Sequence, residues 1–364
     1  MEKYNPPIGT PLKELETPCL VLDLNALEHN FQVMANTYKN TNAKLRQHTK
    51  NVKAPIIAHS QIHAGGTLEG VCTAKVAEAE VMVEGGLNDI LITNQIVTND
   101  KIARLCSLAK RSNIKICIDN AENLRDISQI AHSQKVLIGV LIEVQTNILR
   151  AGIRKAEEGV KLAKLAQTLP GIKFKGVMSH QHVENDKGRK HRILESRKCI
   201  QMCLDVKTAI ESAGIPVEIV SSGETSTYDA VPDLSEVTEV EGGSYAMMST
   251  GFSYLKEFEF AGKVLGTIIS TPLPGIAIGD VGLLAMSGNI LPSVGDKDRV
   301  KVVSMQNDHL LLQDEGFPRL TIGEKFLLIP GHQDTMVNRW DQYVAIRNNI
   351  VEAVWDIPGR GCHN

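Results

Sequence analysis

One lysine in the sequence is a candidate nucleophile because of the residues around it. Lys50 lies in the segment 45–53, which also contains Arg46, His48 and Lys53. Neighbouring positive charge and partial desolvation both lower the pKa of a lysine amine and make it more nucleophilic. A solvated basic turn is the alternative interpretation of such a run. We therefore treat Lys50 as a reactive amine whose role depends on the elements that position it.

A second candidate site is the segment 221–227, which is rich in small residues that carry hydroxyl groups. It reads Ser-Ser-Gly-Glu-Thr-Ser-Thr, and the segment 242–245 reads Gly-Gly-Ser-Tyr. Backbone N–H groups and hydroxyls of such loops can surround a phosphate group. An ordinary turn is the alternative for either segment.

A third candidate is the pair His332 and Asp334, within the segment 330–334. If this segment is extended, residues two positions apart point to the same face and can bind one metal ion. An imidazole and a carboxylate suit Mn²⁺, Mg²⁺ or Zn²⁺, with water in the remaining positions. The alternative is a chance pairing without a metal.

Apolar runs that alternate with helical segments must position these residues. We expect strands at 20–23, 68–73, 89–93, 114–119, 136–144, 174–179, 217–222 and 238–241. Such runs are typical of parallel strands buried on both faces. About eight βα units in roughly 240 residues predict a closed, TIM-like (β/α)8 barrel. Reactive groups of such barrels gather where the strands end, as Lys50, Arg150 and His180 are expected to do.

The pattern changes after residue 255. Short strands at 264–270, 299–303, 309–313 and 325–330 are separated by turn residues, without long helices between them. This pattern predicts a C-terminal all-β domain. We therefore expect a barrel domain over 20–255 and a β domain over 256–364 that carries the metal site, with residues 1–19 packed on the β domain.

Composition and charge exclude several classes of function. The 364 residues carry a net charge of −3, so general electrostatic attraction to nucleic acid or to an anionic membrane is not expected. We find no apolar run of the ~18 residues that a membrane span needs, and no signal peptide. Seven scattered cysteines do not resemble a disulfide framework, which favours the cytoplasm. The partner is expected to be a small molecule.

Several segments together resemble the D-threonine aldolase and D-serine dehydratase family, relatives of alanine racemase with a barrel and a β domain. Their order and spacing carry the resemblance: 17–23, 46–50, 70–80, 89–95, 147–152 and 242–245. A nucleophilic lysine and a phosphate cradle on a barrel are typical of pyridoxal-phosphate enzymes. The resemblance implies pyridoxal 5'-phosphate as the cofactor of a fold type III enzyme, a divalent metal and a homodimer.

The resemblance also implies a role for each site residue. Lys50 would form the Schiff base, Arg150 would contact the phenolic oxygen, and His180 would lie against the pyridine ring. Glu241 would lie near the pyridine nitrogen, with a surface glutamate as the alternative. The remaining cofactor-binding residues, on the phosphate side, would be Ser222, Gly223, Thr225 and Tyr245, and the metal ligands would be His332 and Asp334.

The chain departs from the family pattern at three places. Gln47 stands where the family has proline, and Asn51 and Val52 stand where it has threonine and histidine. Glu224 replaces the second glycine of the phosphate loop, which brings a carboxylate near a phosphate dianion unless the side chain points away.

The resemblance implies an aldolase that cleaves a β-hydroxy-D-amino acid, similar to D-threonine, to glycine and an aldehyde. The metal would lower the pKa of the substrate hydroxyl, and His180 or His182 would accept its proton. Asp334, in place of the cysteine more frequent in dehydratases, favours this function. A dehydratase of the D-serine or D-3-hydroxyaspartate type, giving a 2-oxo acid and ammonia, is the alternative. A racemase comes third, and a non-enzymatic cofactor carrier would not need the β domain.

Overall fold

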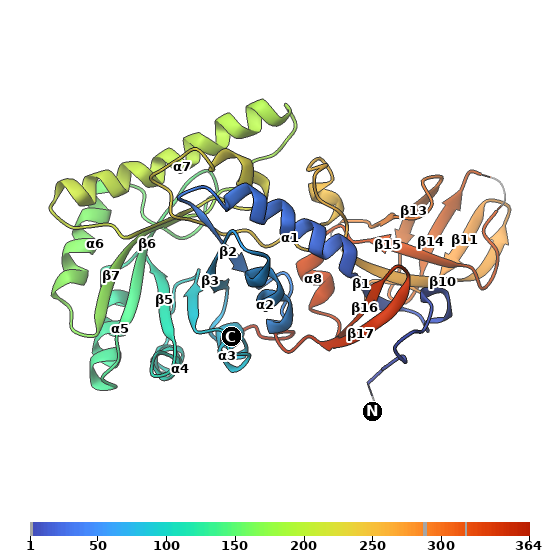
Figure 1. Ribbon diagram of the computed structural model, residues 1–364, viewed down its shortest axis with the longest axis horizontal. Helices are drawn as coiled ribbons and strands as arrows, with labels where there is room; N and C mark the ends of the chain where they lie inside the picture. Colours follow the sequence, from blue (N-terminus) through green and yellow to red (C-terminus); the bar gives the residue numbers. More distant parts are fainter. Residues whose placement is uncertain (1–2, 287–289, 317–318) are drawn as a thin grey trace. The chain divides into compact units, whose positions relative to one another are not determined.

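The computed structural model describes residues 3–286, 290–316 and 319–364, and the chain divides into two compact units (Figure 1). The barrel unit contains residues 34–50, 55–243 and 362–364. The β unit contains the described residues up to Val33, residues 51–54, and the described residues from Ser244 to Gly361.

In the barrel unit, eight parallel strands close on themselves. They are β2 (Lys44–His48), β3 (Thr67–Thr73), β4 (Asp89–Ile92), β5 (Asn113–Ile118), β6 (Ile138–Val144), β7 (Ile172–Ser179), β8 (Ile219–Ser222) and β9 (Glu239–Val240). β9 pairs with β2 in parallel and closes the ring. Inside it, apolar side chains from five successive strands form one buried cluster, made of Cys72, Leu91, Cys117, Leu141 and Met178.

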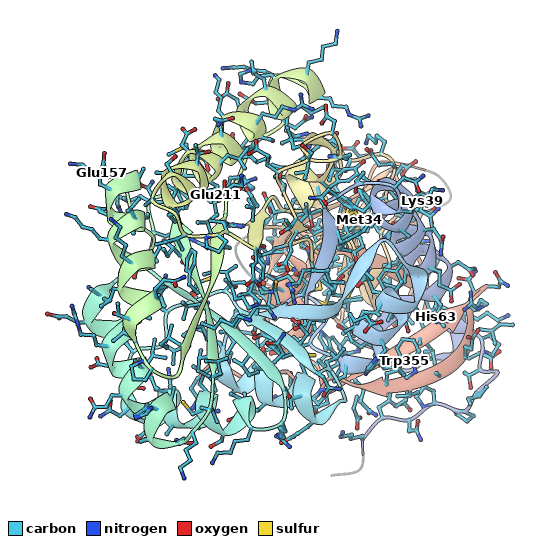
Figure 2. The ribbon with its side chains drawn as sticks, turned by 60° about the vertical axis from the view of Figure 1, so that its left-hand side comes forward. Met34, Lys39, His63, Glu157, Glu211 and Trp355 are labelled. Carbon is cyan, nitrogen blue, oxygen red and sulfur yellow. The ribbon has the colours of Figure 1, made fainter. Side chains whose placement is uncertain are left out.

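Amphipathic helices connect the barrel strands and cover them. They are α2 (Pro55–Ala64), α3 (Val76–Glu84), α4 (Asn99–Ala109), α5 (Ala121–Ser133), α6 (Ala156–Thr168) and α7 (Arg189–Ser212). Helices α3 to α7 pack side by side around the strands (Figure 1). Glu157 and Glu211 mark the exposed faces of α6 and α7, where charged side chains extend outward (Figure 2). Within the described part of the chain, no helix is long and apolar enough to cross a membrane.

A buried charged cluster lies near the N-terminal ends of the barrel strands. The guanidinium group of Arg46 donates to both carboxylate oxygens of Glu239, at 2.8 and 2.6 Å, and to Asp89 at 2.6 Å. Lys115 donates to the same Asp89 oxygen at 2.7 Å. Buried charges are tolerated only when they are paired. A shift of any one of the four strands would separate these pairs, so the contacts help to fix the register of the strands.

The β unit contains a nine-stranded sheet, and one of its inner strands comes from the N-terminal part of the chain. Its strands are β1 (Cys19–Asp23), β10 (Gly262–Leu273), β11 (Ile276–Gly279), β12 (Ser293–Val294), β13 (Val300–Met305), β14 (Leu310–Asp314), β15 (Lys325–Ile329), β16 (Gln342–Arg347) and β17 (Ile350–Asp356). The unit also holds the short helix α8 (Gln333–Val337). Near the N-terminus, Gly9 N–H donates to the carbonyl oxygen of Val351 at 2.8 Å.

The predicted fold class, a (β/α)8 barrel followed by a mostly β domain, is confirmed. The assignment of 20–23 to the barrel was wrong, because β1 pairs with β10 and β16 in the β unit. Its place in the barrel is taken by β2. The two units also have other limits than the predicted ones: the barrel unit starts at Met34 and the β unit resumes at Ser244. Residues 1 and 2 of the predicted N-terminal segment lie outside the described residues.

α1 (Leu24–Tyr38) belongs to both units, since the division falls between Val33 and Met34. Its buried apolar side chains recur at helical spacing, at Leu27, Phe31 and Met34. This spacing is typical of a helix that buries one face.

Candidate active site

Lys50 lies just beyond the C-terminal end of β2, as the sequence predicts for a reactive group of a barrel. The N–H of Thr49 donates to the carbonyl oxygen of Cys72 at 2.9 Å, and its hydroxyl donates to the same oxygen at 3.0 Å. The N–H of His48 donates to Gly242 at 2.8 Å. These bonds anchor the end of β2 to the strands on both sides and place the partly buried Lys50 at the rim.

The positive charge expected next to Lys50 is not supplied by a free arginine. Arg46 is paired with Glu239 and Asp89 near the other end of β2, which neutralises its charge. The imidazole of His48 lies 3.2 Å from the hydroxyl of Thr93 through Nε2. At this end of the barrel, Arg150, which follows β6, and Lys50 both lie close enough to His180 for their charges to act on it.

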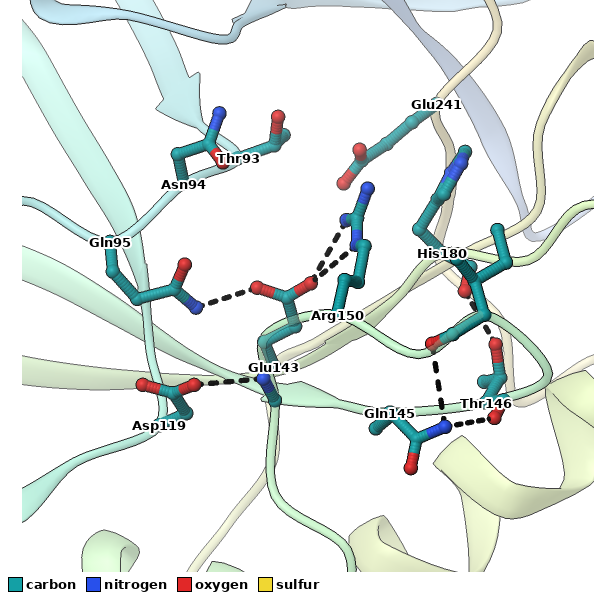
Figure 3. A network of polar contacts seen from close by, with 12 residues as sticks. Thr93, Asn94, Gln95, Asp119, Glu143, Gln145, Thr146, Arg150, His180 and Glu241 are labelled. Carbon is teal, nitrogen blue, oxygen red and sulfur yellow. Dashed lines mark hydrogen bonds and ion pairs between the residues drawn. The ribbon is translucent and has the colours of Figure 1, made fainter.

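Glu143, near the end of β6, holds Arg150 in place (Figure 3). Its Oε1 accepts from Nη2 of Arg150 at 2.9 Å and from Nε at 3.2 Å, and its Oε2 accepts from Gln95 at 2.6 Å. The backbone N–H of Gly152 donates to Asp119 at 2.8 Å, which fixes the loop after Arg150. Sequence analysis missed Glu143, although an acidic residue inside the apolar run of β6 was a signal for it.

His180 and His182 follow β7 on a loop whose carbonyl groups accept hydrogen bonds from the loop after β6. Thr146 donates its hydroxyl to the carbonyl oxygen of His180 at 2.5 Å, and Asn147 donates to that of His182 at 2.6 Å. Desolvation lowers the pKa of His180 to about 4, and the charges of Arg150 and Lys50 act in the same direction. His180 therefore lies close to both cations and is neutral at physiological pH.

Glu241 follows β9 and is buried, which contradicts the alternative of a surface glutamate. The hydroxyl of Ser221 donates to its Oε1 at 2.8 Å. Burial raises the pKa of Glu241 to about 7, and the charge of Glu239 adds to this effect. Arg150 opposes the shift and lies beside Glu241 in Figure 3. The carboxyl group of Glu241 therefore changes its charge near neutral pH.

The predicted phosphate loop lies between β8 and β9. The hydroxyl of Ser222 lies 2.8 Å from that of Ser179, and the N–H of Gly243 donates to the hydroxyl of Thr225 at 3.3 Å. Gly223 has a φ of +114°, and an added Cβ would lie 3.2 Å from Val231. This backbone conformation favours glycine, so the turn that follows β8 depends on it.

Tyr245 belongs to the β unit, where its ring packs among aromatic side chains. The ring centroids of Phe31 and Phe258 lie 6.3 and 5.9 Å from it. Burial raises the pKa of its phenol well above the usual range. Its proposed contact with the phosphate stays a prediction.

His332 and Asp334 occupy the start of α8 rather than an extended segment. His332 is the N-terminal flanking residue and is exposed, whereas Asp334 lies in the first turn and is partly buried. The amide of Asn51 donates to Oδ1 of Asp334 and, at 3.3 Å, to the hydroxyl of Ser244. Oδ1 of the buried Asn51 has no hydrogen-bond partner among the described residues.

The donors at α8 suit a hard divalent cation, although the argument from an extended segment was wrong. An imidazole, a carboxylate and an unpaired amide oxygen are all ligands that such ions accept. Within the described ranges, no cluster of three or more His, Cys, Asp or Glu residues could hold a metal. A metal at this place would therefore be bound by His332 and Asp334, and it stays a prediction.

The barrel unit also fits the cofactor that the resemblance implies. Lys50 and Arg150 lie close enough to His180 for their charges to act on it, and Glu241 is buried beside Arg150. An amine, a planar imidazole, a guanidinium group and a buried carboxyl group are what a pyridine aldehyde needs around it.

Comparisons with known proteins agree with this arrangement. Residues 22–250 match the family described as "Alanine racemase, N-terminal domain", and residues 261–346 match the "Putative serine dehydratase domain". The chain is 32% identical to the 3-hydroxy-D-aspartate aldolase of Paracoccus denitrificans (strain Pd 1222), with 97% of this chain and 94% of the relative covered. It is 31% identical to the D-threonine aldolase of Arthrobacter sp., with 97% and 95% covered.

A solved structure supports the same assignment. The crystal structure of D-threonine aldolase from Filomicrobium marinum superposes with a TM-score of 0.93 and 30% identity, over 99% of this chain and 100% of that one. The matches extend over both units and nearly the whole chain, so the resemblance found in the sequence is confirmed. The chain belongs to the D-threonine aldolase and D-serine dehydratase family of alanine-racemase-like, fold type III pyridoxal-phosphate enzymes.

Proposed function

We propose that the protein is a pyridoxal-phosphate-dependent carbon–carbon lyase that cleaves a β-hydroxy-D-amino acid to glycine and an aldehyde. The observation that carries the proposal is the similarity, over nearly the full length, to relatives named as aldolases for two such amino acids. The cluster of Lys50, Arg150, His180 and Glu241 at the barrel rim supplies the chemical groups that such a cleavage requires.

The residues of the barrel unit would hold the cofactor. When bound, pyridoxal phosphate supplies an aldehyde that condenses with an amine and a ring that accepts the electron pair of a breaking bond. Lys50 would carry it covalently, and Arg150, held by Glu143, would orient its phenolic side. Its phosphate would be bound by Ser222, Gly223 and Thr225, and the resemblance adds Tyr245, a residue of the β unit.

Proton transfer would depend on the residues that follow β7. The substrate hydroxyl must lose its proton as its carbon becomes an aldehyde, and His180 or His182 could accept it. His332 and Asp334 would hold a divalent cation, whose charge lowers the pKa of a hydroxyl that binds to it. The carboxyl group of Glu241 would lie near the pyridine nitrogen, where its charge favours the protonated ring.

A dehydratase is the second candidate, because residues 261–346 match a putative serine dehydratase domain. In that reaction a base such as Lys50 removes the α-proton, and the β-hydroxyl leaves as hydroxide. The products would be a 2-oxo acid and ammonia.

Product analysis distinguishes the two reactions. The purified protein, supplied with pyridoxal phosphate and Mn²⁺, is incubated with D-threonine, and the products are identified by NMR. We expect glycine and acetaldehyde, and no reaction with the Lys50→Ala variant. A 2-oxo acid with ammonia would establish the dehydratase, and turnover by Lys50→Ala would remove Lys50 from the reaction.

The assembly and location of the protein are further proposals. We propose a homodimer, which the resemblance implies, in the cytoplasm, which the scattered cysteines favour, with a small β-hydroxy-D-amino acid as the substrate. Light scattering of the purified protein would measure the mass of the assembly, and a monomeric mass would contradict the dimer.

A further inference from the structure

A carboxylate of the phosphate loop faces one of the two histidines that follow β7. Oε1 of Glu224 lies 3.6 Å from Nδ1 of His182, which is an ion-pair separation. The side chain of Glu224 is 12% exposed, whereas that of His182 is 55% exposed. The imidazole of His182 therefore has one nitrogen beside a sheltered carboxylate and an edge that solvent or a substrate can reach.

Glu224 is held in this position by its own loop. The hydroxyl of Ser226 donates to Oε1 of Glu224, and the N–H of Glu224 donates to the hydroxyl of Thr227 at 2.9 Å. Burial alone would raise the pKa of Glu224, but His182, His180 and Ser226 together hold it below the usual range. Glu224 is therefore ionised, and its charge faces the histidines.

A buried carboxylate in a phosphate loop is energetically unfavourable unless another interaction offsets its burial. Burying an unpaired charge is unfavourable, and a second anion nearby adds to the cost. Family members have glycine at this position, according to the resemblance, so the loop can be built without a carboxylate. The partner that Glu224 gains in this chain is His182.

We propose that Glu224 is a positioning residue for His182, and that His182 rather than His180 accepts the proton of the substrate hydroxyl. The inference rests on the proposed aldolase function and deepens it. The negative charge of a carboxylate 3.6 Å from Nδ1 favours the tautomer with the proton on that nitrogen, which leaves the lone pair that accepts a new proton on Nε2. The same carboxylate stabilises the imidazolium ion that then forms.

The surroundings of His180 do not favour this role. Desolvation and the charges of Arg150 and Lys50 oppose a further positive charge on its ring, and together they outweigh the charge of Glu224, which acts in the opposite direction. The charged groups that act on His182 are Glu224 and Glu184, and both raise its pKa. The pKa of His180 is therefore lowered and that of His182 is raised, although both lie on one loop. This difference suits His180 to a neutral packing role and His182 to accepting a proton.

In the proposed step, bonds break and form at the substrate hydroxyl and between Cα and Cβ. The substrate O–H bond breaks, its proton moves to Nε2 of His182, and its electron pair becomes the second bond of the new aldehyde carbonyl. The Cα–Cβ bond breaks, and its electron pair stays with the glycine portion, which takes up a proton from water at Cα before release, while His182 returns its proton to water. The products together contain the atoms of the substrate.

The test compares Glu224→Gln with a matched control, Glu184→Gln, which removes the other carboxylate that acts on His182. For each protein the kcat and KM of D-threonine cleavage are measured, together with the exchange of the glycine α-proton in D₂O. The exchange needs the cofactor and Lys50 but no hydroxyl base. The pKa of His182 is measured by NMR on protein with ¹³C-labelled histidine, assigned with His182→Gln.

We expect Glu224→Gln to lower kcat for cleavage by roughly 10²-fold, the usual size of a general-base contribution, with KM and glycine exchange nearly unchanged. The pKa of His182 should fall in Glu224→Gln and change little in Glu184→Gln. His182→Gln should lose cleavage while glycine exchange persists. Cleavage by His180→Gln should still decrease at low pH, where His182 becomes protonated.

Three results would overturn the inference: cleavage by Glu224→Gln at the rate of the original protein, equal loss of cleavage and glycine exchange, or an unchanged pKa of His182. A Glu224→Gly variant, with the residue of the family pattern, guards against a misfolded glutamine variant. Absence of cleavage in the original protein would instead refute the proposed function, while the NMR titration would still decide whether Glu224 acts on His182.

Discussion

Removing the carboxylate of Glu143 should weaken cofactor binding, because Glu143 fixes the guanidinium group of Arg150. The side chain of Glu143 is only 2% exposed and accepts two bonds from Arg150, at 2.9 and 3.2 Å. Glu143→Gln keeps the shape of the side chain but removes its charge. The guanidinium group then loses its ion pair and is held less firmly before the cofactor binds, and ordering it on binding costs affinity.

The magnitude follows from the exposure of the pair. Hydrogen bonds to charged groups contribute about 1.5–3 kcal/mol, and the 40% exposure of Arg150 favours the lower end, because water replaces part of the loss. About 1.5–2 kcal/mol corresponds to a roughly 10- to 30-fold weaker dissociation constant for pyridoxal phosphate. Spectroscopic titration of the cofactor-free protein with pyridoxal phosphate measures this constant directly.

A second arginine–glutamate pair provides the control. Glu80 accepts from Nε and Nη2 of Arg104 at 2.8 and 2.6 Å, between the helices α3 and α4 on the outside of the barrel. Glu80→Gln removes the same kind of pair without touching the rim, so its cofactor affinity should equal that of the original protein. If Glu143→Gln also binds the cofactor as tightly as the original protein, the positioning role of Glu143 is refuted.

Three further predictions concern charge inside the two units. Burial raises the pKa of Glu241 to about 7, so the folded protein binds this proton more tightly than the unfolded chain, and the stability from Glu241 is lost as pH rises from about 4.5 to 7. Urea unfolding should show that Glu241→Gln removes this loss; the same pH slope in both proteins would contradict it. Glu239→Gln leaves the buried Arg46 without one of its carboxylate partners and should lower the free energy of unfolding in urea by about 3–5 kcal/mol. Loss of an exposed ion pair should lower it much less. Chelation by EDTA should suppress turnover and Mn²⁺ should restore it; turnover that is indifferent to chelation would count against His332 and Asp334 as metal ligands.

Sequence patterns identify the fold because a strand that is buried on both faces has a continuous apolar run in its sequence. The strands β3 to β8 have such runs, and their alternation with helices predicts a barrel. The strand β1 has such a run too, yet it pairs with β10 and β16. Hydrophobicity records that a strand is buried but not which strands lie beside it, and this is why the first barrel strand was assigned wrongly.

In the candidate site, too, the sequence predicted individual residues but not the residues that they contact. Lys50, Arg150 and His180 were expected where strands end, and the family resemblance added Glu241. Their partners were not predicted, because ion pairs join residues far apart in the chain, such as Arg46 with Glu239. Without those partners, Arg46 looked like a source of positive charge for Lys50, and Glu224 looked like a misplaced anion. The helix α8 was missed because five residues carry too little periodicity to be recognised.

The central claim is that the amine of Lys50 carries the cofactor, and chemical trapping tests it most directly. The protein loaded with pyridoxal phosphate is reduced with borohydride, digested and analysed by peptide mass spectrometry. A phosphopyridoxyl group on the peptide that contains Lys50, at that residue, is the predicted result. The same group on Lys53 or Lys115, or on no lysine, would contradict the assignment.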